Sequence, residues 1–155
     1  MTEITSQYSQ FLAFAVGEAE YCVPIMAVRE INGWSPATRL PNAPDYMRGV
    51  INLRGSIVPI FDLRARFGGG MTVPDKTHVV IILAVGTRNF GLLVDAVSDI
   101  LSAGAEHIKP APTESADPAH DFISGLLMIE GRIVAILNVG NLFDLNDPRL
   151  TQEVA

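Results

Sequence analysis

Short runs of apolar residues, each ended by glycine, proline or a polar pair, divide this chain into segments of strand length. Runs of this length with partial alternation are typical of β-strands rather than helices. In the first half the pattern predicts strands at Tyr8–Val16, Tyr21–Pro24, Val28–Asn32, Val50–Leu53 and Ile57–Phe61. In the second half it predicts strands at 77–85, 90–93 and 97–101, and a hairpin within 123–137. The pattern therefore indicates an all-β fold.

The segment 47–68 combines two of these strands with a turn and a short helix. Gly55 lies in the turn, where it can take a positive φ without a Cβ penalty. Pro59 cannot donate a ladder hydrogen bond, so its strand is expected at a sheet edge or at a bulge. Asp62 is expected to cap a helix that Gly68 closes.

The order of residues in the first half returns in the second. Gly49 and Gly55 correspond to Gly125 and Gly131 at an offset of 76 (125 − 49 = 131 − 55 = 76). Residues 11–31 correspond to 80–100 at an offset of 69 (80 − 11 = 69). A repeat of this kind indicates an internal duplication, in which two similar halves share a core because each is too small to bury much alone.

The duplication predicts one domain over about residues 9–145, made of two small β-barrels packed together. The halves are expected at about 9–70 and 77–145, with exchange of strands between them possible. The glycine-rich stretch 68–75 is the natural junction, and 102–121 is expected to be a long surface connection. Residues 142–155 are expected to form a short helix and a frayed tail, and 1–8 and 146–155 are expected to be tails.

Composition narrows the classes of function. Residues 1–76 carry seven basic and seven acidic side chains, whereas residues 77–155 carry four and ten, so the second half holds the whole net charge of −6. An acidic chain is a poor match for a phosphate backbone, which argues against nucleic-acid binding. No apolar run is long enough to span a membrane, and no signal peptide is evident. A single cysteine, Cys22, fits a reducing cytoplasm and is expected to be a small buried hydrophobe rather than a reactive thiol.

Catalytic signatures are missing from the sequence. It has no Walker A loop, nucleophile elbow, HExxH motif, paired CxxC or EF-hand loop. His78, His107 and His120 do not have the spacing of metal ligands. Asp62 and Asp95 could form a carboxylate pair, but Asp62 already has a role as a helix cap. A non-enzymatic protein without a cofactor or a metal is therefore expected.

Polar side chains within apolar strands remain as candidates for binding. Arg54 at the hairpin tip is either a solvated turn residue or is held close to Glu30, where it offers several donors to a partner. Val28, on the same strand face as Glu30, would supply apolar contact beside it. Trp34 is either a core residue or a binding anchor in a loop.

Two consecutive segments, Arg48–Gly55 (RGVINLRG) and Ile57–Arg64 (IVPIFDLR), resemble the CheW-type chemotaxis coupling proteins. Val28–Ile31 (VREI) and Gly91–Asp99 (GLLVDAVSD) support the resemblance, which covers about residues 9–145. It implies two five-stranded, SH3-like β-barrel subdomains packed together, with short helices at the ends. It also implies a non-enzymatic cytoplasmic adaptor, recruited to membrane receptor arrays without inserting into the membrane. Such an adaptor joins the tips of chemoreceptors (methyl-accepting chemotaxis proteins) to the regulatory domain of the histidine kinase CheA.

The resemblance also assigns contact residues. For the receptor it implies Val28, Glu30, Gly49 and Arg54. For the kinase it implies second-half strand residues, Val79, Phe90 and Leu92, which are either contact residues or core residues. Three alternatives remain: the same scaffold in a chemosensory pathway that does not control motility, a barrel that binds single-stranded nucleic acid, and a small-molecule enzyme.

Overall fold

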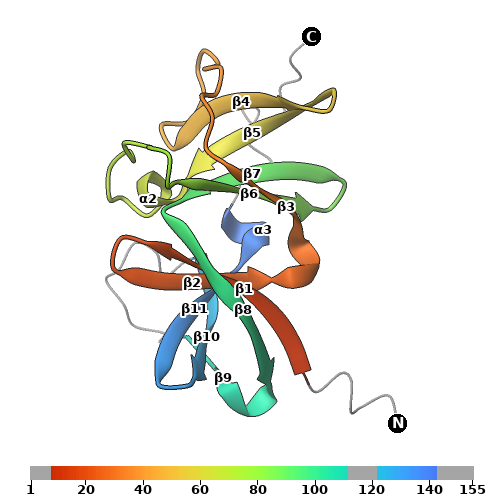
Figure 1. The fold of residues 1–155 in the computed structure, drawn as a ribbon, viewed down its shortest axis with the longest axis vertical. Coiled ribbons are helices and arrows are strands. Elements are labelled where there is room, and N and C mark those ends of the chain that lie inside the picture. Colours follow the sequence, from red (N-terminus) through yellow and green to blue (C-terminus); the bar gives the residue numbers. More distant parts are fainter. Residues whose placement is uncertain (1–7, 112–121, 143–155) are drawn as a thin grey trace.

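The computed structural model describes residues 8–111 and 122–142, which form two packed β-subdomains (Figure 1). A five-stranded sheet occupies the upper part of Figure 1 and a six-stranded sheet the lower part. The all-β prediction is confirmed. The strand count differs in the lower subdomain, where a two-residue strand adds a sixth member.

The six-stranded sheet has the order β8-β1-β2-β11-β10-β9. Its strands are β1 (Tyr8–Val16), β2 (Ala19–Pro24), β8 (Ala96–Gly104), β9 (Ile108–Lys109), β10 (Ile123–Ile129) and β11 (Arg132–Leu137). The five-stranded sheet has the order β3-β6-β7-β5-β4. Its strands are β3 (Val28–Gly33), β4 (Met47–Leu53), β5 (Ser56–Asp62), β6 (Val79–Val85) and β7 (Arg88–Val94). The short helices are η1 (Ile25–Ala27), α2 (Leu63–Arg66), η2 (Ala105–His107) and α3 (Val139–Leu142).

The two sheets do not follow the two halves of the sequence. The hairpin β1–β2 from the first half joins β8 to β11 of the second, and the hairpin β6–β7 from the second half joins β3, β4 and β5 of the first. The two strand orders are nonetheless equivalent, and each sheet contains one parallel pair, β2 with β11 and β7 with β5. Each subdomain therefore combines the later strands of one half with the first hairpin of the other half.

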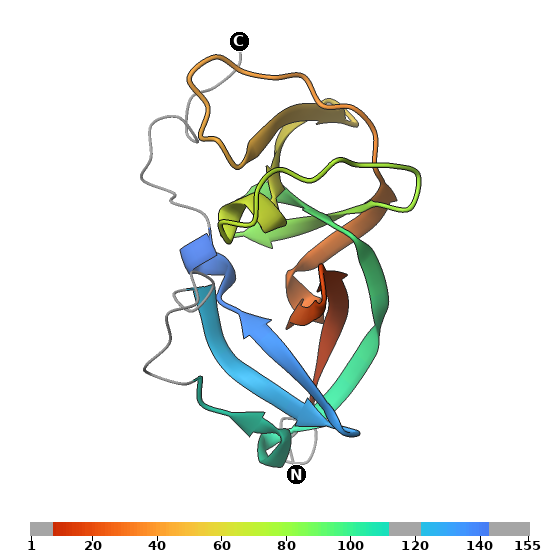
Figure 2. The ribbon, with the colours of Figure 1, turned by 90° about the vertical axis from the view of Figure 1, so that its left-hand side faces the viewer.

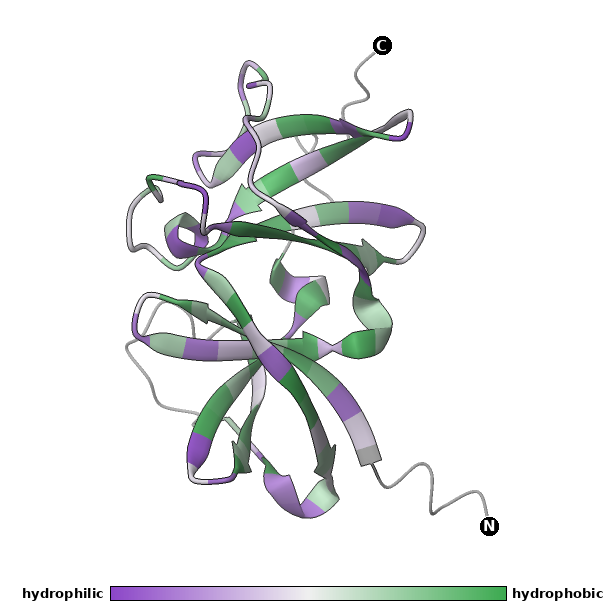
Figure 3. Ribbon diagram, viewed as in Figure 1, coloured by the Kyte–Doolittle hydropathy of each residue, from purple (hydrophilic) through white to green (hydrophobic). Residues whose placement is uncertain are grey.

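This exchange explains why the first strand of each half is almost continuously apolar. In β1, Leu12 and Phe14 enter the core between the subdomains, and Ala13 enters the core of the six-stranded subdomain. In β6, Ile81 enters the central core, and Ile82 enters the core of the five-stranded subdomain. Both strands are thus buried on two faces, so the simple alternation of a half-buried strand is lost. β6 is coloured hydrophobic along its length in Figure 3.

The duplication is also visible in the backbone of the two later hairpins. Arg54 and Gly55 have φ of 51° and 90°, and Glu130 and Gly131 have φ of 53° and 74°. Two consecutive positive φ values are characteristic of the two-residue turn that matches strand twist. Each hairpin also has a register shift at its start, next to Gly49 in β4 and to Gly125 in β10.

The helix after β5 begins and ends where the sequence predicts. The carboxylate of Asp62 accepts a hydrogen bond from the backbone N–H of Ala65 at 3.3 Å, and Gly68 follows the helix with a φ of 84°. The prediction that Pro59 lies in an edge strand is wrong, because β5 lies between β4 and β7. Its ladder with β7 starts at Ile60, immediately after the proline, so no hydrogen bond to β7 is lost at Pro59.

Other expectations need smaller changes. The surface connection predicted for residues 102–121 contains regular secondary structure in its first part. β8 continues to Gly104 and is followed by η2 and β9. Residues 112–121 and 143–155, where the rest of that connection and most of the expected C-terminal helix fall, lie outside the described residues. Cys22 is fully buried, and burial raises the pKa of its thiol to about 12, which confirms its core role. Trp34 is partly buried against the core of the five-stranded subdomain.

Candidate functional site

The five-stranded sheet ends in two edge strands, β3 and β4, and a cleft of about 280 Å³ lies beside them. Its lining comes from both edges and from the buried strands behind them: Glu30, Asn32, Gly33, Ser35, Ile51, Asn52, Leu53, Arg54, Ile60 and Val80. Thr38 covers part of the β4 edge through a bridge to Val50, and the cleft beside the edges can receive a partner. The cleft is therefore the first candidate for a binding site.

Arg54 and Glu30 bridge the cleft. Arg54 Nη1 donates to Glu30 Oε1 at 3.3 Å, and Nη2 contacts Oε2, so the guanidinium meets the carboxylate with two nitrogens. The Arg54 side chain is 72% exposed, whereas Glu30 is 26% exposed. The hydrogen bond from Arg54, with a second from Asn32, holds the pKa of Glu30 below its ordinary value of 4.5. The pair is therefore ionised at neutral pH and presents a planar group with several donors to solvent.

Of the four residues assigned to receptor binding, the structure brings Glu30 and Arg54 into contact. Val28 and Gly49 are not among the residues that line the cleft. Val28 begins β3 and packs against the central core. Gly49 has a φ of 139°, and a Cβ there would overlap the carbonyl oxygen of Thr38. Gly49 thus lets residues 34–41 approach β4, where Thr38 and Val50 exchange two backbone hydrogen bonds of 2.9 and 2.8 Å.

The structure places the residues assigned to kinase binding in or against the central core. Phe90 and Leu92 are fully buried in the central core, so they have no exposed side-chain surface with which to contact a partner. Val79 is partly buried against the same core. The reason is the exchange of hairpins, which places β6 and β7 in the middle of the five-stranded sheet rather than in a separate second barrel.

Two asparagines of the cleft were not singled out in the sequence. Asn32 Nδ2 donates to Glu30 Oε1 at 3.0 Å, and Asn52 Oδ1 accepts from the backbone N–H of Gly55 at 2.8 Å. The two-residue spacing of Glu30 and Asn32 on one strand face could have identified the first. An asparagine three residues before a turn glycine could have identified the second, because such side chains commonly accept turn hydrogen bonds.

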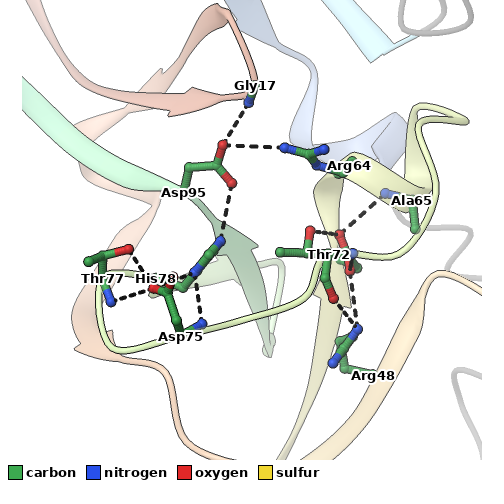
Figure 4. A network of polar contacts seen from close by, with 10 residues as sticks. Gly17, Arg48, Arg64, Ala65, Thr72, Asp75, Thr77, His78 and Asp95 are labelled. Carbon is green, nitrogen blue, oxygen red and sulfur yellow. Dashed lines mark hydrogen bonds and ion pairs between the residues drawn. The ribbon is translucent and has the colours of Figure 1, made fainter.

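A second cleft, of about 470 Å³, lies at the junction of the subdomains (Figure 4). Several of its polar side chains contact one another or nearby backbone groups. Asp95 Oδ2 accepts from the N–H of Gly17 at 2.7 Å and lies 3.6 Å from Arg64 Nη2, and Asp95 Oδ1 lies 3.5 Å from His78 Nε2. His78 Nδ1 accepts from the N–H of Asp75 at 3.0 Å. These contacts tie the turn after β1 to the link between β7 and β8.

The buried carboxylate of Asp62 contacts four polar groups, which belong to Ala65, Thr72 and Arg48. Besides capping α2, it accepts from the N–H and the hydroxyl of Thr72, both at 2.7 Å, and lies 3.5 Å from Arg48 Nη1. Asp62 and Asp95 therefore act in two separate structural clusters. The described residues contain no group of three or more His, Cys, Asp or Glu side chains placed to hold a metal ion. Within the same residues, no helix has the length and apolar character needed to cross a membrane.

A family model described as CheW-like domain matches residues 10–147. The chain belongs to the CheW-like family. The chemotaxis protein CheW of Rhizobium meliloti (strain 1021) is 47% identical over 140 residues, which cover 90% of each chain. CheW of Klebsiella aerogenes is 40% identical over 94% of this chain and 88% of its own length.

The CheW-like fold is shown by a solved structure as well. The crystal structure of the scaffolding protein TtCheW from Thermoanaerobacter tengcongensis superposes with a TM-score of 0.82 at 30% identity, covering 89% of this chain and 94% of that one. The chain thus shares the fold of TtCheW.

Proposed function

We propose that this chain is a non-enzymatic adaptor that couples the cytoplasmic tip of a chemoreceptor to the regulatory domain of the histidine kinase CheA. The ion pair Glu30–Arg54 is the observation that supports this proposal most directly, because it lies over a cleft lined by both edge strands in a CheW-like chain. Such a site can bind a protein surface, and it presents no group poised for chemistry. The receptor tip is assigned to this cleft.

The kinase is assigned to the other subdomain. Met128 in β10 and Ile133 in β11 are directly opposed on one face of the hairpin, and they are 45% and 61% exposed. Adjacent exposed apolar side chains of this size are typical of a contact surface between proteins. The two assigned surfaces lie on different subdomains, so one chain can hold both partners at once.

The experiment measures binding of the whole chain separately to a receptor cytoplasmic fragment and to a CheA regulatory domain. Arg54→Glu and Glu30→Arg should each weaken receptor binding by about tenfold or more, because a hot-spot group is lost and its charge inverted. Ile133→Lys should weaken kinase binding and leave receptor binding unchanged.

A matched control is available at Ile57, which occupies the position equivalent to Ile133 (133 − 57 = 76) and is 46% exposed on the other subdomain. Ile57→Lys should leave kinase binding as in the wild type. Equal losses for the two lysine variants would contradict the assignment of the kinase to the six-stranded subdomain. Wild-type binding to both partners by the Arg54 and Glu30 variants would contradict the receptor site.

A further inference from the structure

The turn between β4 and β5 carries an arginine where the backbone favours glycine or asparagine. Arg54 has a φ of 51°, a conformation that costs energy for a residue with a long side chain. The side chain of Asn52 accepts the N–H of the next residue, Gly55, at 2.8 Å. Because Arg54 and Gly55 share a peptide unit, this hydrogen bond fixes the plane of the peptide that follows Arg54.

The chain contains its own control for this arrangement. In the equivalent turn of the other hairpin, Glu130 and Gly131 adopt the same pair of positive φ values. The residue equivalent to Asn52 there is Met128 (128 − 52 = 76). Its side chain has no amide oxygen that could accept the corresponding hydrogen bond. The turn therefore forms without an asparagine, and folding of the hairpin does not account for Asn52.

The residue at the tip distinguishes the two turns. Arg54 reaches across the cleft to Glu30, an acceptor 24 residues away in sequence. Most of the Arg54 side chain is exposed. Forming the ion pair therefore costs side-chain entropy, while solvent screens the attraction between the two charges. An exposed pair keeps one geometry when other groups restrict its members, and such preorganisation favours binding.

Glu30 is restricted from its own side of the cleft. Asn32 Nδ2 donates to Glu30 Oε1 at 3.0 Å, the same oxygen that Arg54 Nη1 approaches. Asn32 and Glu30 lie two residues apart on β3, so the amide reaches the carboxylate along one strand face. Each member of the pair thus has an asparagine beside it in the same strand or turn.

We propose that Asn52 and Asn32 are positioning residues, which hold Arg54 and Glu30 in the bridged geometry that the receptor tip recognises. Asn52 acts as an acceptor and Asn32 as a donor. This role rests on the proposed function for its biological meaning, but the effect on the ion pair is a property of the free chain. It can therefore be measured without any partner.

The variants follow from the donor and acceptor roles. Asn52→Met introduces the residue that the other hairpin carries, so the turn should still form, but Arg54 loses its restraint. Asn52→Asp keeps an acceptor for the N–H of Gly55 and should behave as the wild type. Asn32→Asp loses the donor and places a second carboxylate beside Glu30, so it should release the pair, whereas Asn32→Gln keeps a donor on a longer side chain and should restore part of the effect.

The first measurement is the coupling between Glu30 and Arg54, obtained from urea unfolding of the single and double alanine variants. It should fall to half or less when the same cycle is repeated in the Asn52→Met background, with little change in the unfolding midpoint of Asn52→Met itself. Unchanged coupling would overturn the proposal. A large fall in the midpoint of Asn52→Met would also overturn it, since Asn52 would then stabilise the hairpin rather than position the pair.

The second measurement is binding of the full chain to the receptor cytoplasmic fragment. Asn52→Met and Asn32→Asp should each bind about fivefold more weakly, and Asn52→Asp should bind as the wild type. Wild-type binding by Asn52→Met would overturn the link to recognition. If the wild-type chain itself failed to bind the fragment, the proposed function would fail, while the coupling measurement would still decide whether the asparagines position the pair.

Discussion

Arg66 Nε donates a hydrogen bond to the backbone carbonyl oxygen of Leu142 at 3.0 Å. The two residues occupy equivalent positions in the duplicated halves (142 − 66 = 76), at the ends of α2 and α3. The two short helices are therefore equivalent elements of the duplicated halves, and they contact each other. Figure 2 shows them side by side between the subdomains. The guanidinium of Arg66 also lies 4.3 Å from the ring centre of Tyr46 and 4.4 Å from that of Phe122.

Replacing Arg66 by methionine should destabilise the chain by about 2 kcal/mol, because two cation–π contacts and one hydrogen bond are lost while the apolar volume is largely kept. Urea unfolding of the whole chain measures this loss. Arg39→Met serves as the control, since Arg39 is an exposed loop residue, and it should change stability little. A loss for Arg66→Met no greater than that for Arg39→Met would show that the junction does not depend on this arginine.

Gly49→Ala should destabilise the chain by about 3 kcal/mol, because alanine disfavours a φ of 139° and its Cβ would overlap the carbonyl oxygen of Thr38. Gly125, the equivalent glycine, has an ordinary φ, and a Cβ there would lie 3.0 Å from the carbonyl oxygen of Lys109. Gly125→Ala should therefore cost about 1 kcal/mol. Thermal unfolding of both variants tests the order of the two effects, and equal losses would contradict it.

The result for Gly49 bears on its assignment to receptor binding. If Gly49→Ala lowers receptor binding, the loss should follow from displacement of residues 34–41 and not from a lost contact. A variant that retained the wild-type unfolding midpoint but bound no receptor would instead support direct contact at this glycine.

The sequence was most informative where the chemistry is local. The positive φ at Gly55, the cap at Asp62 and the short helix up to Gly68 are determined by nearest neighbours, and all three are present. The duplication predicted two similar β-subdomains for the same reason, since each half repeats the local signals of the other, and the two observed sheet orders are equivalent. The proximity of Glu30 to Arg54 was one of two interpretations of the sequence, and the structure supports it.

Long-range pairing was harder to predict. The periodicity of β6 and β7 is compatible with an outer strand or an inner one, and the exchange of hairpins decides that Phe90 and Leu92 are buried. The partners of Asp95 also come from distant segments, with Gly17 lying 78 residues away in sequence. Such contacts depend on topology, which residue patterns alone do not specify.

Asp62 offers a test of buried polar networks. Asp62→Ala should destabilise the chain by about 3 kcal/mol, because both Thr72 donors and one end of α2 lose their acceptor in a buried site. Asn138 is the equivalent residue (138 − 62 = 76), and its side chain accepts from the N–H of Asn141 at 3.3 Å in a partly exposed position. Asn138→Ala should therefore cost about 1 kcal/mol, the typical value of a cap. Chemical denaturation of both variants should show this difference, and a smaller loss for Asp62→Ala would contradict the network.

The contacts of Arg132 with two carboxylates should make the stability of the chain depend on pH. Its guanidinium donates to Glu20 Oε2 at 2.7 Å and to Asp99 Oδ2 at 3.1 Å, linking β11 to β2 and β8. These hydrogen bonds lower the pKa of Glu20 and of Asp99 from their ordinary values of 4.5 and 3.8. A carboxyl group with a lowered pKa in the folded state stabilises the chain above its unfolded pKa, and this contribution is lost as the pH falls through the folded pKa.

Arg132→Gln should therefore be less stable than the wild type near neutral pH. The difference between the two urea midpoints should stay constant down to about pH 5 and shrink below about pH 4, as both carboxylates become protonated in the wild type. Arg39→Gln, made in an exposed loop, should show no such convergence. If the difference for Arg132→Gln were independent of pH down to about pH 3, the arginine would act through packing of its side chain and not through the two carboxylates.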